Sequence, residues 1–405
     1  MRRWTALMIM ALLLVGVLPA AAFAEMVTAR VVVDGIELKT DVPPMLLNGR
    51  TMVPFRAIAE ALGVDVKWVG ETQTILATGQ GRELRLVVGQ PTALVNGGEK
   101  ELDVAPQIVN NRTLVPARVF AEAFGATVAW DGATMTASVH SAARPMQTLV
   151  FYGLGSYKWR GFLHRFSDVA FTWSSITPDG ELSLNQNEYY WPSGAEELLQ
   201  MTRYARVGRF LSVIQWDTDE RLTKLVLNAE ARDRLANQIE QLVRDQRLEG
   251  VVLDLEGLGF GKKDEELEQV RQGFVALVKA VSDRLHKWQK EVVVAVHPPN
   301  GWYPGYDYKA IAQHADRVLV MAYPYGGDEP EPLDLVEEAI VMSLKEVPAE
   351  KLLLGIMMEH ESRETVVQKV ALAKRHNLAG VSIWIITSLD QQEMEAIESL
   401  VTPKK

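Results

Sequence analysis

Apolar runs of strand length alternate with amphipathic helical stretches through residues 148–400, and this alternation limits the fold more than any other feature. Eight runs are rich in Val, Ile and Leu and have the length of buried strands. They are Thr148–Gly153, Val169–Trp173, Arg209–Gln215, Gly250–Leu255, Glu291–Val296, Arg317–Ala322, Leu352–Met357 and Gly380–Ile385. Helical patterns separate them, for example Arg232–Asp245, Glu265–Lys287, Leu335–Leu344 and Glu364–Arg375.

Eight β/α units over about 250 residues have the size and order of a (β/α)8 TIM barrel, so we predict an α/β fold of this kind. An open doubly wound sheet is the alternative, and it usually carries a Gly-rich turn after its first strand. The Gly-rich stretch Gly257–Lys262 lacks the spacing and the following Ser or Thr of a phosphate-binding loop, which favours the barrel.

The fourth predicted strand ends in two carboxylates, Asp254 and Glu256. Because side chains alternate between the two faces of a strand, both should emerge on one side at its C-terminal end. Burying two neighbouring acids raises at least one pKa, and a carboxylic acid that stays protonated near neutral pH can serve as a general acid. A capped or salt-bridged acid at a strand end is the alternative, purely structural role.

In a TIM barrel the reacting groups lie where the strands end, at the C-terminal face. The other side chains expected at these ends are mostly aromatic: Tyr152, Trp173, Gln215, Trp216, His297, Tyr323, Tyr325, Glu359 and Trp384. Aromatic faces stack on the C–H faces of sugars, while acids and amides bind hydroxyl groups. We therefore expect a carbohydrate cleft around the carboxylate pair, the alternative for any single Trp being a place in the core.

Residues 1–24 have the pattern of a cleaved secretory signal peptide. Arg2 and Arg3 precede an apolar run at Ala6–Val17, and Ala22-Phe23-Ala24 is a small-x-small cleavage site. We expect cleavage after Ala24 and a secreted or envelope-associated bacterial protein that has no cysteine and no remaining membrane span. The net charge of −10 argues against nucleic acid and anionic membranes as partners.

Residues 28–139 contain a tandem repeat, in which residues 31–77 align with 93–139 at a constant separation of 62. The strongest match pairs Arg50-Thr51-Met52-Val53-Pro54-Phe55-Arg56 with Arg112-Thr113-Leu114-Val115-Pro116-Ala117-Arg118. Each copy has Asx-Gly hairpin signals, a Pro that suits the start of a short helix, and an alternating strand that ends near a Trp. We therefore predict an α+β domain of two small packed modules, followed by a linker at His140–Gln147.

The paired Arg-Thr-x-Val-Pro-x-Arg motifs resemble the copper amine oxidase N-terminal-like domain, a module repeated on bacterial exported proteins. The seven histidines, at positions 140, 164, 286, 297, 314, 360 and 376, lie at or beyond the end of this region. Without Cys or His a copper site is not expected, and we predict no metal, no cofactor and no oxidase activity. Arg50, Arg56, Arg112 and Arg118 either form a ligand-binding face or satisfy acids and carbonyls of the repeat. A spacer role or contact with the cell wall is expected.

Residues 148–400 resemble glycoside hydrolase family 18, in particular the branch found in bacterial spore and cell-wall proteins. Its fourth-strand motif, Asp-Gly-x-Asp-x-Asp-x-Glu, falls on Glu249–Glu256. The resemblance implies that Glu256 is the general acid and that Asp254 positions the acetamide of the substrate. It also implies that Tyr323, in Met321-Ala322-Tyr323-Pro324, binds the same acetamide, and that Trp384 forms the floor of the sugar subsite.

The mechanism implied by this resemblance is substrate-assisted retention, in which the N-acetyl oxygen of the sugar attacks the anomeric carbon. Glu256 then protonates the leaving oxygen and later activates water, while Asp254 and Tyr323 stabilise the oxazolinium-like intermediate. The implied substrate is a glycan that contains N-acetylglucosamine, such as peptidoglycan or a chitin-like polymer.

The chain departs from the family motifs at three positions. Val252 occupies the place of the middle Asp or Asn, which should lower the pKa of Asp254 by removing an acidic neighbour. Pro324 replaces the Asp of the Met-x-Tyr-Asp motif, and Glu249 is a mild replacement of the first Asp. An exported glycosidase is the main prediction. A lectin-like barrel that binds glycans without cleaving them is the main alternative, and a structural envelope protein is the third.

Overall fold

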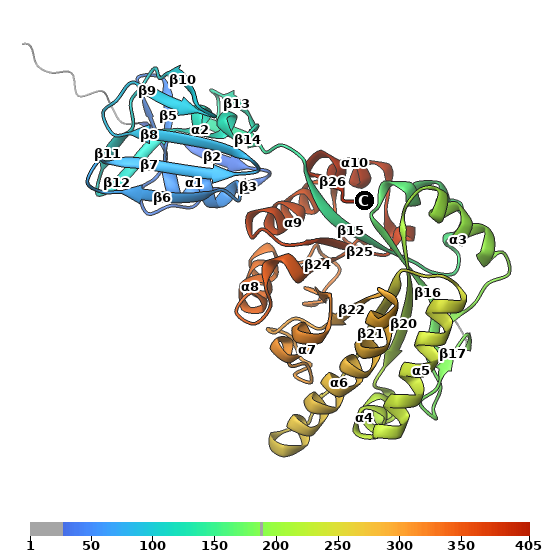
Figure 1. The fold of residues 1–405 in the computed structure, drawn as a ribbon. Coiled ribbons are helices and arrows are strands. Elements are labelled where there is room, and N and C mark those ends of the chain that lie inside the picture. The colour runs from blue at the N-terminus through green and yellow to red at the C-terminus, as the bar shows by residue number, and fades with distance from the viewer. Residues whose placement is uncertain (1–26, 187–188) are drawn as a thin grey trace, which may run out of the picture.

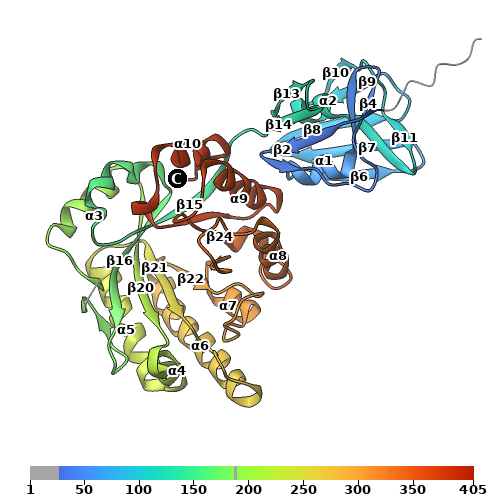
Figure 2. The ribbon, with the colours of Figure 1, turned by 180° about the vertical axis from the view of Figure 1, so that it is seen from behind.

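The computed structural model describes residues 27–186 and 189–405, so the expected signal peptide at 1–24 lies outside the described residues. A small domain of antiparallel sheets precedes a larger α/β domain, and the two lie side by side in both ribbon views (Figures 1 and 2). Within the described ranges, no helix has the length and apolar character needed to cross a membrane.

Eight parallel strands form a closed barrel at the centre of the larger domain. In barrel order they are β15 (Arg144–Tyr152), β16 (Asp168–Ile176), β20 (Gly208–Trp216), β21 (Gly250–Glu256), β22 (Glu291–Val296), β23 (Arg317–Val320), β24 (Leu352–Met357) and β25 (Gly380–Trp384). β15 pairs with both β25 and β16, which closes the ring. The TIM-barrel prediction is therefore confirmed, and each predicted strand overlaps an observed one.

Helices cover the outside of the barrel, as Figure 1 shows. They are α3 (Ala195–Tyr204), α4 (Arg221–Leu227), α5 (Ala229–Asp245), α6 (Asp264–Leu285), α7 (Tyr308–His314), α8 (Leu333–Ser343), α9 (Arg363–Arg375) and α10 (Gln391–Leu400). Short 3₁₀ segments lie at η1 (Ser156–Arg165), η2 (Thr218–Glu220), η3 (His286–Trp288), η4 (Ala349–Lys351) and η5 (Ile386–Ser388), and short strands at β17 (Leu182–Ser183), β18 (Asn185–Gln186), β19 (Tyr189–Tyr190) and β26 (Val401–Pro403).

The alternation of side chains along the strands divides the core into two layers. On β21, Val251, Leu253 and Leu255 pack against the helices, while Val252 belongs to a separate cluster inside the barrel. Asp254 and Glu256 continue the inward-facing series of Val252, because they are two and four residues further along the strand. The predicted common face of the two carboxylates is thus the barrel interior.

A buried ion-pair cluster closes the barrel at the N-terminal ends of its strands. The Arg317 guanidinium, whose side chain is 7% exposed, binds Asp168 at 2.6 Å and Glu291 at 2.7 Å. It also lies 5.0 Å from the centre of the Phe210 ring. Burial raises the pKa of Asp168, and the positive charge of Arg317 opposes this shift. The positive charge of Arg317 therefore favours the ionised form of Asp168 against the cost of burial.

The two repeats of the small domain are interleaved. The first supplies β2 (Arg30–Val33), β3 (Ile36–Glu37), β4 (Met45–Leu47), β5 (Arg50–Pro54), α1 (Phe55–Ala61), β6 (Asp65–Val69) and β7 (Thr74–Gly79), with β1 (Val27–Thr28) before them. After β8 (Arg82–Val87), the second supplies β9 (Thr92–Val95), β10 (Gly98–Glu101), β11 (Gln107–Val109), β12 (Arg112–Pro116), α2 (Ala117–Ala123), β13 (Thr127–Asp131) and β14 (Thr136–His140).

Each sheet of this domain contains strands of both repeats. β5 pairs antiparallel with β12, and Val53 lies opposite its repeat equivalent Val115, so an approximate two-fold axis passes between them. β14 of the second repeat adds in parallel to β2 of the first, and β9 adds to β8. The two predicted modules pack as one domain, and neither repeat completes its sheets without the other.

Hydrogen bonds connect the two domains in addition to the covalent link of the chain. The irregular segment is shorter than the expected linker, because β14 continues to His140 and β15 begins at Arg144. Asp34 accepts a hydrogen bond from the Ser141 amide at 2.8 Å, and the Lys374 ammonium donates to the Ala142 carbonyl at 2.9 Å. Gln368 of α9 also donates to the carbonyl of Gly35 at 2.8 Å.

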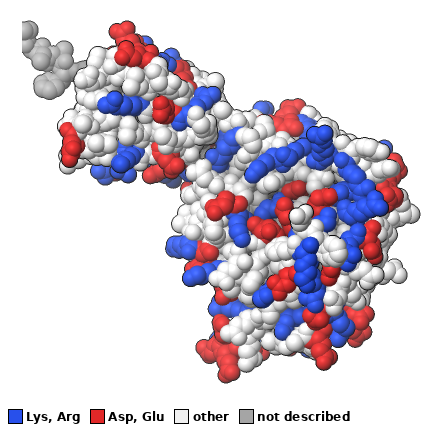
Figure 3. Space-filling model, in the orientation of Figure 1, with Lys and Arg blue, Asp and Glu red and all other residues white. Residues whose placement is uncertain are grey.

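Acidic and basic side chains are interspersed over the face shown in Figure 3. The negative net charge is therefore not gathered into a single acidic area on that side of the molecule.

Replacing Arg317 by Ala should destabilise the barrel by about 3–5 kcal/mol, because Asp168 is left buried without its counter-ion. Chemical denaturation at pH 7 measures this change. The matched control is Lys279→Ala, which removes an exposed ion pair with Asp283 and should cost less than about 1 kcal/mol. Equal effects of the two substitutions would contradict a structural role for the buried cluster.

Candidate active site

Asp254 and Glu256 meet at the C-terminal end of β21, inside the barrel. Asp254 is 2% exposed, and its Oδ1 atom is buried without a hydrogen-bond partner. Burial raises the pKa of Asp254 to about 7. Burial, followed by the negative charge of Asp254, raises the pKa of Glu256 to about 9. Between these values the pair holds a single proton, and a carboxyl group that keeps its proton beside an anion can serve as a general acid.

His297, which directly follows β22, contacts the carboxyl group of Glu256. Its Nε2 lies 3.4 Å from Oε2 of Glu256 and accepts a hydrogen bond from the Gly257 amide at 3.3 Å. Burial lowers the pKa of His297 to about 4, so the imidazole is neutral at physiological pH. A neutral imidazole supplies no positive charge that would lower the pKa of Glu256. His297 therefore does not oppose the effect of burial on Glu256.

Aromatic rings extend from His297 to the surface. Tyr303 lies 4.2 Å from His297 between ring centres, and Trp216 lies 5.8 Å from it. Phe260 continues the series at 5.6 Å from Tyr303. Trp216 and Phe260 are 45% and 65% exposed, so they offer apolar faces to solvent next to Glu256, which keeps 13% of its side chain accessible. Such faces suit the C–H surfaces of sugars.

Tyr323 reaches the site from the segment that follows β23, and Trp384 from the end of β25. The pKa of the buried Tyr323 hydroxyl is raised by burial and then by the charges of Asp254 and Glu256, so this phenol remains a neutral donor. Tyr323 packs over Gly355, where a Cβ atom would lie 3.0 Å from the Tyr323 ring. Trp384 is half-buried against the interior cluster, with an edge contact to Phe151 at 5.0 Å.

Five other predicted residues are not brought to the carboxylate pair. Tyr152 and Trp173 face the helix layer, where they pack edge to face at 6.3 Å. They line a separate cavity of about 290 Å³ with Tyr190 and Pro192. Gln215 lies opposite Leu255 on the ladder, and its side chain donates to the Trp216 carbonyl at 2.9 Å.

The remaining two lie in loops. Tyr325 donates from its hydroxyl to Asn300 Oδ1 at 3.0 Å and packs against the outer core. Glu359 is exposed after the end of β24. For both residues a position near a strand end does not bring the side chain to the interior, so we remove them from the candidate site.

Sequence reasoning gave no role to three residues that the structure brings together at the site: His297, Tyr303 and Phe260. His297 had a usable signal, because it directly follows a buried strand and was expected at the C-terminal face. Tyr303 and Phe260 lie in loops, where no periodic pattern predicts the direction of a side chain.

The family comparisons agree with this geometry. Residues 147–362, slightly more than half of the chain, match the profile of Glycosyl hydrolases family 18. The chain belongs to this family. Residues 32–139 match the profile of the Copper amine oxidase N-terminal domain, which confirms both resemblances seen in the sequence.

Two curated relatives come from Bacillus subtilis (strain 168). YdhD, named as a sporulation-specific glycosylase, is 25% identical over 195 residues, which is 45% of this chain and 43% of that protein. The Cortical fragment-lytic enzyme is 27% identical over 148 residues, 34% of this chain and 32% of that enzyme. The chain thus matches less than half the length of either relative.

Solved structures of low identity share the barrel fold. A chitinase from Chromobacterium violaceum superimposes with a TM-score of 0.55 at 16% identity, covering 63% of this chain and 98% of that chain. The spore cortex-lytic enzyme SleL of Bacillus megaterium gives 0.54 at 16% identity, with 65% and 76% covered.

The two raised pKa values should make the barrel less stable as the pH increases. Both folded-state pKa values lie above those of the unfolded chain, about 4. Their stabilising contribution is therefore complete below about pH 4 and is lost as the pH rises through about 7 and about 9. Asp254→Asn should accordingly raise Tm by at least about 3 °C near pH 8 and much less near pH 5.

Thermal melts of the wild type and this variant across pH 4–9 test the prediction. Asp283→Asn is the control, because Asp283 is exposed and its ion pair with Lys279 lowers its pKa. That substitution should not raise Tm at any pH. A constant Tm difference between Asp254→Asn and the wild type would show that Asp254 is ionised in the folded protein throughout.

Proposed function

We propose that this protein is an exported glycosidase that hydrolyses a glycan containing N-acetylglucosamine, with Glu256 as general acid and base. The observation that carries the proposal is a buried Glu256 beside a second acid at the C-terminal end of a barrel strand, where burial and the charge of Asp254 raise the pKa of Glu256, in a member of glycosyl hydrolases family 18. Exposed aromatic rings beside this acid support a sugar substrate.

The proposed mechanism uses the N-acetyl group of the substrate as the nucleophile. Glu256 donates its proton to the leaving glycosidic oxygen as the bond to the anomeric carbon breaks. The acetamide oxygen closes a ring on that carbon, and ionised Asp254 stabilises the positive charge. The Tyr323 hydroxyl, held neutral by burial, donates to the acetamide. Glu256 then removes a proton from the water that opens the ring, which regenerates the starting state and retains the configuration.

Val252 changes the electrostatics of this mechanism. Val252 removes an acidic neighbour from Asp254, and burial alone raises the pKa of Asp254 to about 7. An Asp or Asn at this position could hydrogen-bond to Asp254, whereas Val252 is fully buried and supplies only desolvation. The Oδ1 atom of Asp254 is thus left buried without a hydrogen-bond partner.

The substrate class and the location of the protein follow from different observations. The names of the relatives point to glycans of the spore cortex and to chitin, and both contain N-acetylglucosamine; we propose peptidoglycan as the more fitting of the two. The basic start, apolar run and small-residue cleavage site within residues 1–24 support export, with cleavage after Ala24.

A lectin-like barrel is the second candidate, and the surroundings of Asp254 favour it. An aspartate with a pKa near 7 is a weaker electrostatic partner for a cationic intermediate than one that is fully ionised. Binding of an uncharged sugar does not require an ionised Asp254. The two candidates differ in one product: only the glycosidase releases reducing ends from chitooligosaccharides or peptidoglycan.

Glu256→Gln should reduce kcat on peptidoglycan fragments or chitooligosaccharides about 100- to 10,000-fold, because the amide cannot transfer a proton to the leaving oxygen. Reducing-end release by the purified protein is the measurement. Glu268→Gln, which lies on the exposed side of α6, should leave the rate unchanged. Activity that survives in Glu256→Gln would exclude Glu256 as the acid, and an inactive wild type that still binds the glycan would establish the lectin-like candidate.

The pH profile of kcat/KM should be bell-shaped, with its maximum between about 7 and about 9. The rate rises as Asp254 loses its proton and falls as Glu256 loses its own. In Asp254→Asn the basic limb should move to lower pH, because the charge of Asp254 contributes to the raised pKa of Glu256. A substrate with an activated aryl leaving group keeps the residual rate of this variant measurable. A maximum near pH 5, typical of unperturbed carboxylates, would contradict the assignment.

A further inference from the structure

The four arginines of the repeat motifs divide into two pairs with different surroundings. Arg112 binds Asp41 at 2.5 Å, and Arg50 binds Asp103 at 2.6 Å, so these two form equivalent ion pairs across the repeats. Arg56 and Arg118 make no ion pair or hydrogen bond to any described residue, and both are exposed. The first pair thus joins the two repeats, whereas the second forms no such link among the described residues.

Arg56 and Arg118 line two cavities that the repeat relates to each other. The first has a volume of about 730 Å³ and the second about 270 Å³. Each is formed by the helix start and the Trp of one repeat, together with the hairpin of the other. The corresponding pairs, always 62 positions apart, are Asp41 and Asp103, Pro54 and Pro116, Arg56 and Arg118, Trp68 and Trp130, and, with the repeats exchanged, Arg112 and Arg50.

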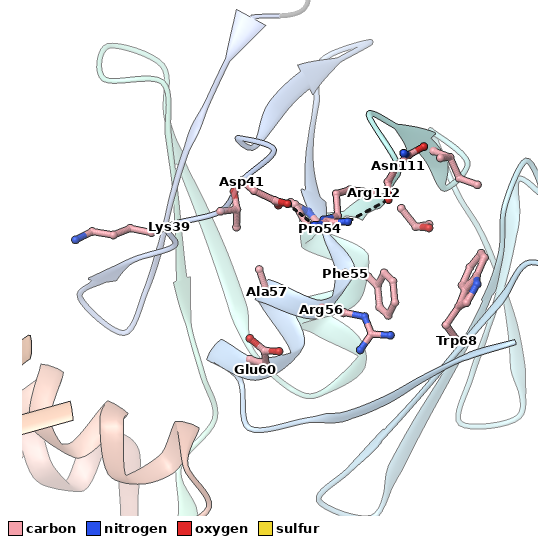
Figure 4. Close-up of a pocket in the computed structure, with 13 residues that line it drawn as sticks. Lys39, Asp41, Pro54, Phe55, Arg56, Ala57, Glu60, Trp68, Asn111 and Arg112 are labelled. Carbon is pink, nitrogen blue, oxygen red and sulfur yellow. Dashed lines mark hydrogen bonds and ion pairs between the residues drawn. The ribbon is translucent and has the colours of Figure 1, made fainter. Parts of the chain in front are cut away.

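Figure 4 shows the first of these cavities. The Arg56 guanidinium lies 5.5 Å from the centre of the Phe55 ring, and that ring lies 6.2 Å from the ring of Trp68. In this view the ion pair between Asp41 and Arg112 lies above Phe55 and Arg56. Glu60, on α1, also lines the cavity. The cavity therefore combines two aromatic faces with a cation that has no anionic partner and with an acid.

In the second cavity the Trp is present although the aromatic ring that packs against it in the first cavity is missing. Ala117 replaces Phe55 there, so Trp130 lacks the aromatic neighbour of Trp68 and is 40% exposed. Trp130 lies at the surface rather than in the core, and Arg118 beside it forms, within the described part of the chain, no ion pair that would stabilise the domain. The presence of the Trp in both copies points to a ligand.

We propose that the two cavities are saccharide-binding sites of the N-terminal domain, one in each repeat and separate from the barrel site. The Trp stacks on the C–H face of a sugar ring, and the neighbouring arginine binds a carboxylate group on that sugar or on a substituent attached to it. A planar guanidinium matches a carboxylate with two parallel hydrogen bonds, so carboxylate-bearing glycans bind more tightly than neutral ones. Two such sites on one domain increase the residence time on a polymer that presents many equivalent units.

The test uses the full chain after signal removal, with Glu256→Gln added so that no glycan is cleaved. Affinity for insoluble peptidoglycan is measured by co-sedimentation over a range of polymer concentrations. The double variant Trp68→Ala/Trp130→Ala should weaken binding at least ~10-fold, and each single variant should weaken it less. Lys67→Ala is the matched control, because this exposed cation is next to Trp68 on β6 and points to the other side of the strand; it should change affinity less than ~2-fold.

The second arm separates the carboxylate from the sugar. Calorimetric titration compares a disaccharide–peptide fragment of peptidoglycan, which carries carboxylates, with chitotetraose, which carries none. Arg56→Ala/Arg118→Ala should remove the preference for the fragment and leave binding of chitotetraose within ~2-fold. Since both arginines are exposed, this variant also tests the proposal if the Trp variants do not fold.

Unchanged affinity for peptidoglycan in both double variants would overturn the proposal. So would an equal loss for the two soluble ligands in the arginine variant, because the carboxylate would then have no part in recognition. Cleavage of small chitooligosaccharides by proteins with native Glu256 is measured in parallel, and the N-terminal variants should leave it unchanged. Absence of cleavage in every protein would overturn the proposed glycosidase function without bearing on these two sites.

Discussion

The chemistry proposed for this protein depends on the removal of water from two carboxyl groups at the end of one strand. Alternation along β21 directs Asp254 and Glu256 to the barrel interior, where Val252 already excludes solvent below them. Desolvation penalises the charged form of each acid, and the first charge to form penalises the second. The pair therefore keeps one proton across the neutral range, which exposed carboxylates at the same spacing would have lost.

The rest of the barrel keeps this arrangement in place. At the far end of the strands, Arg317 compensates the buried charge of Asp168, so the unfavourable electrostatics of the active site are not repeated there. At the catalytic end, His297 and Tyr323 are both held neutral and offer an acceptor and a donor without adding charge. The free energy lost by burying Asp254 and Glu256 is tolerated because closure of eight strands buries a large apolar core around them.

The fold and the common face of the two carboxylates were predictable because both follow from periodic patterns. Counting strand-like runs gives the barrel, and the two-residue spacing of the acids gives their common face. The aromatic rim was predicted less well, because proximity to a strand end does not specify the face. Tyr152 follows the inward-facing Phe151 by one residue and so points outward, and an irregular register between Phe171 and Ser174 accompanies the outward position of Trp173.

The N-terminal domain shows a different limit of sequence reasoning. Its hairpin turns were predictable from Asp34-Gly35 and Asn48-Gly49, which adopt the positive φ angles that such turns need. The exchange of strands between repeats was not, because the pairing of β14 with β2 joins segments about a hundred residues apart with no local signal. For the same reason, the two repeat-related cavities could be recognised only from the structure.

Infrared difference spectroscopy of the carboxyl groups tests the central claim most directly. The spectrum of the unliganded protein minus that of Glu256→Gln, recorded at pH 7.5, should contain the C=O band of a protonated carboxylic acid. That band should disappear only as the pH approaches about 9. A difference spectrum with carboxylate bands alone at pH 7.5 would show that Glu256 is already ionised, and the account of a buried, proton-sharing pair would then be wrong.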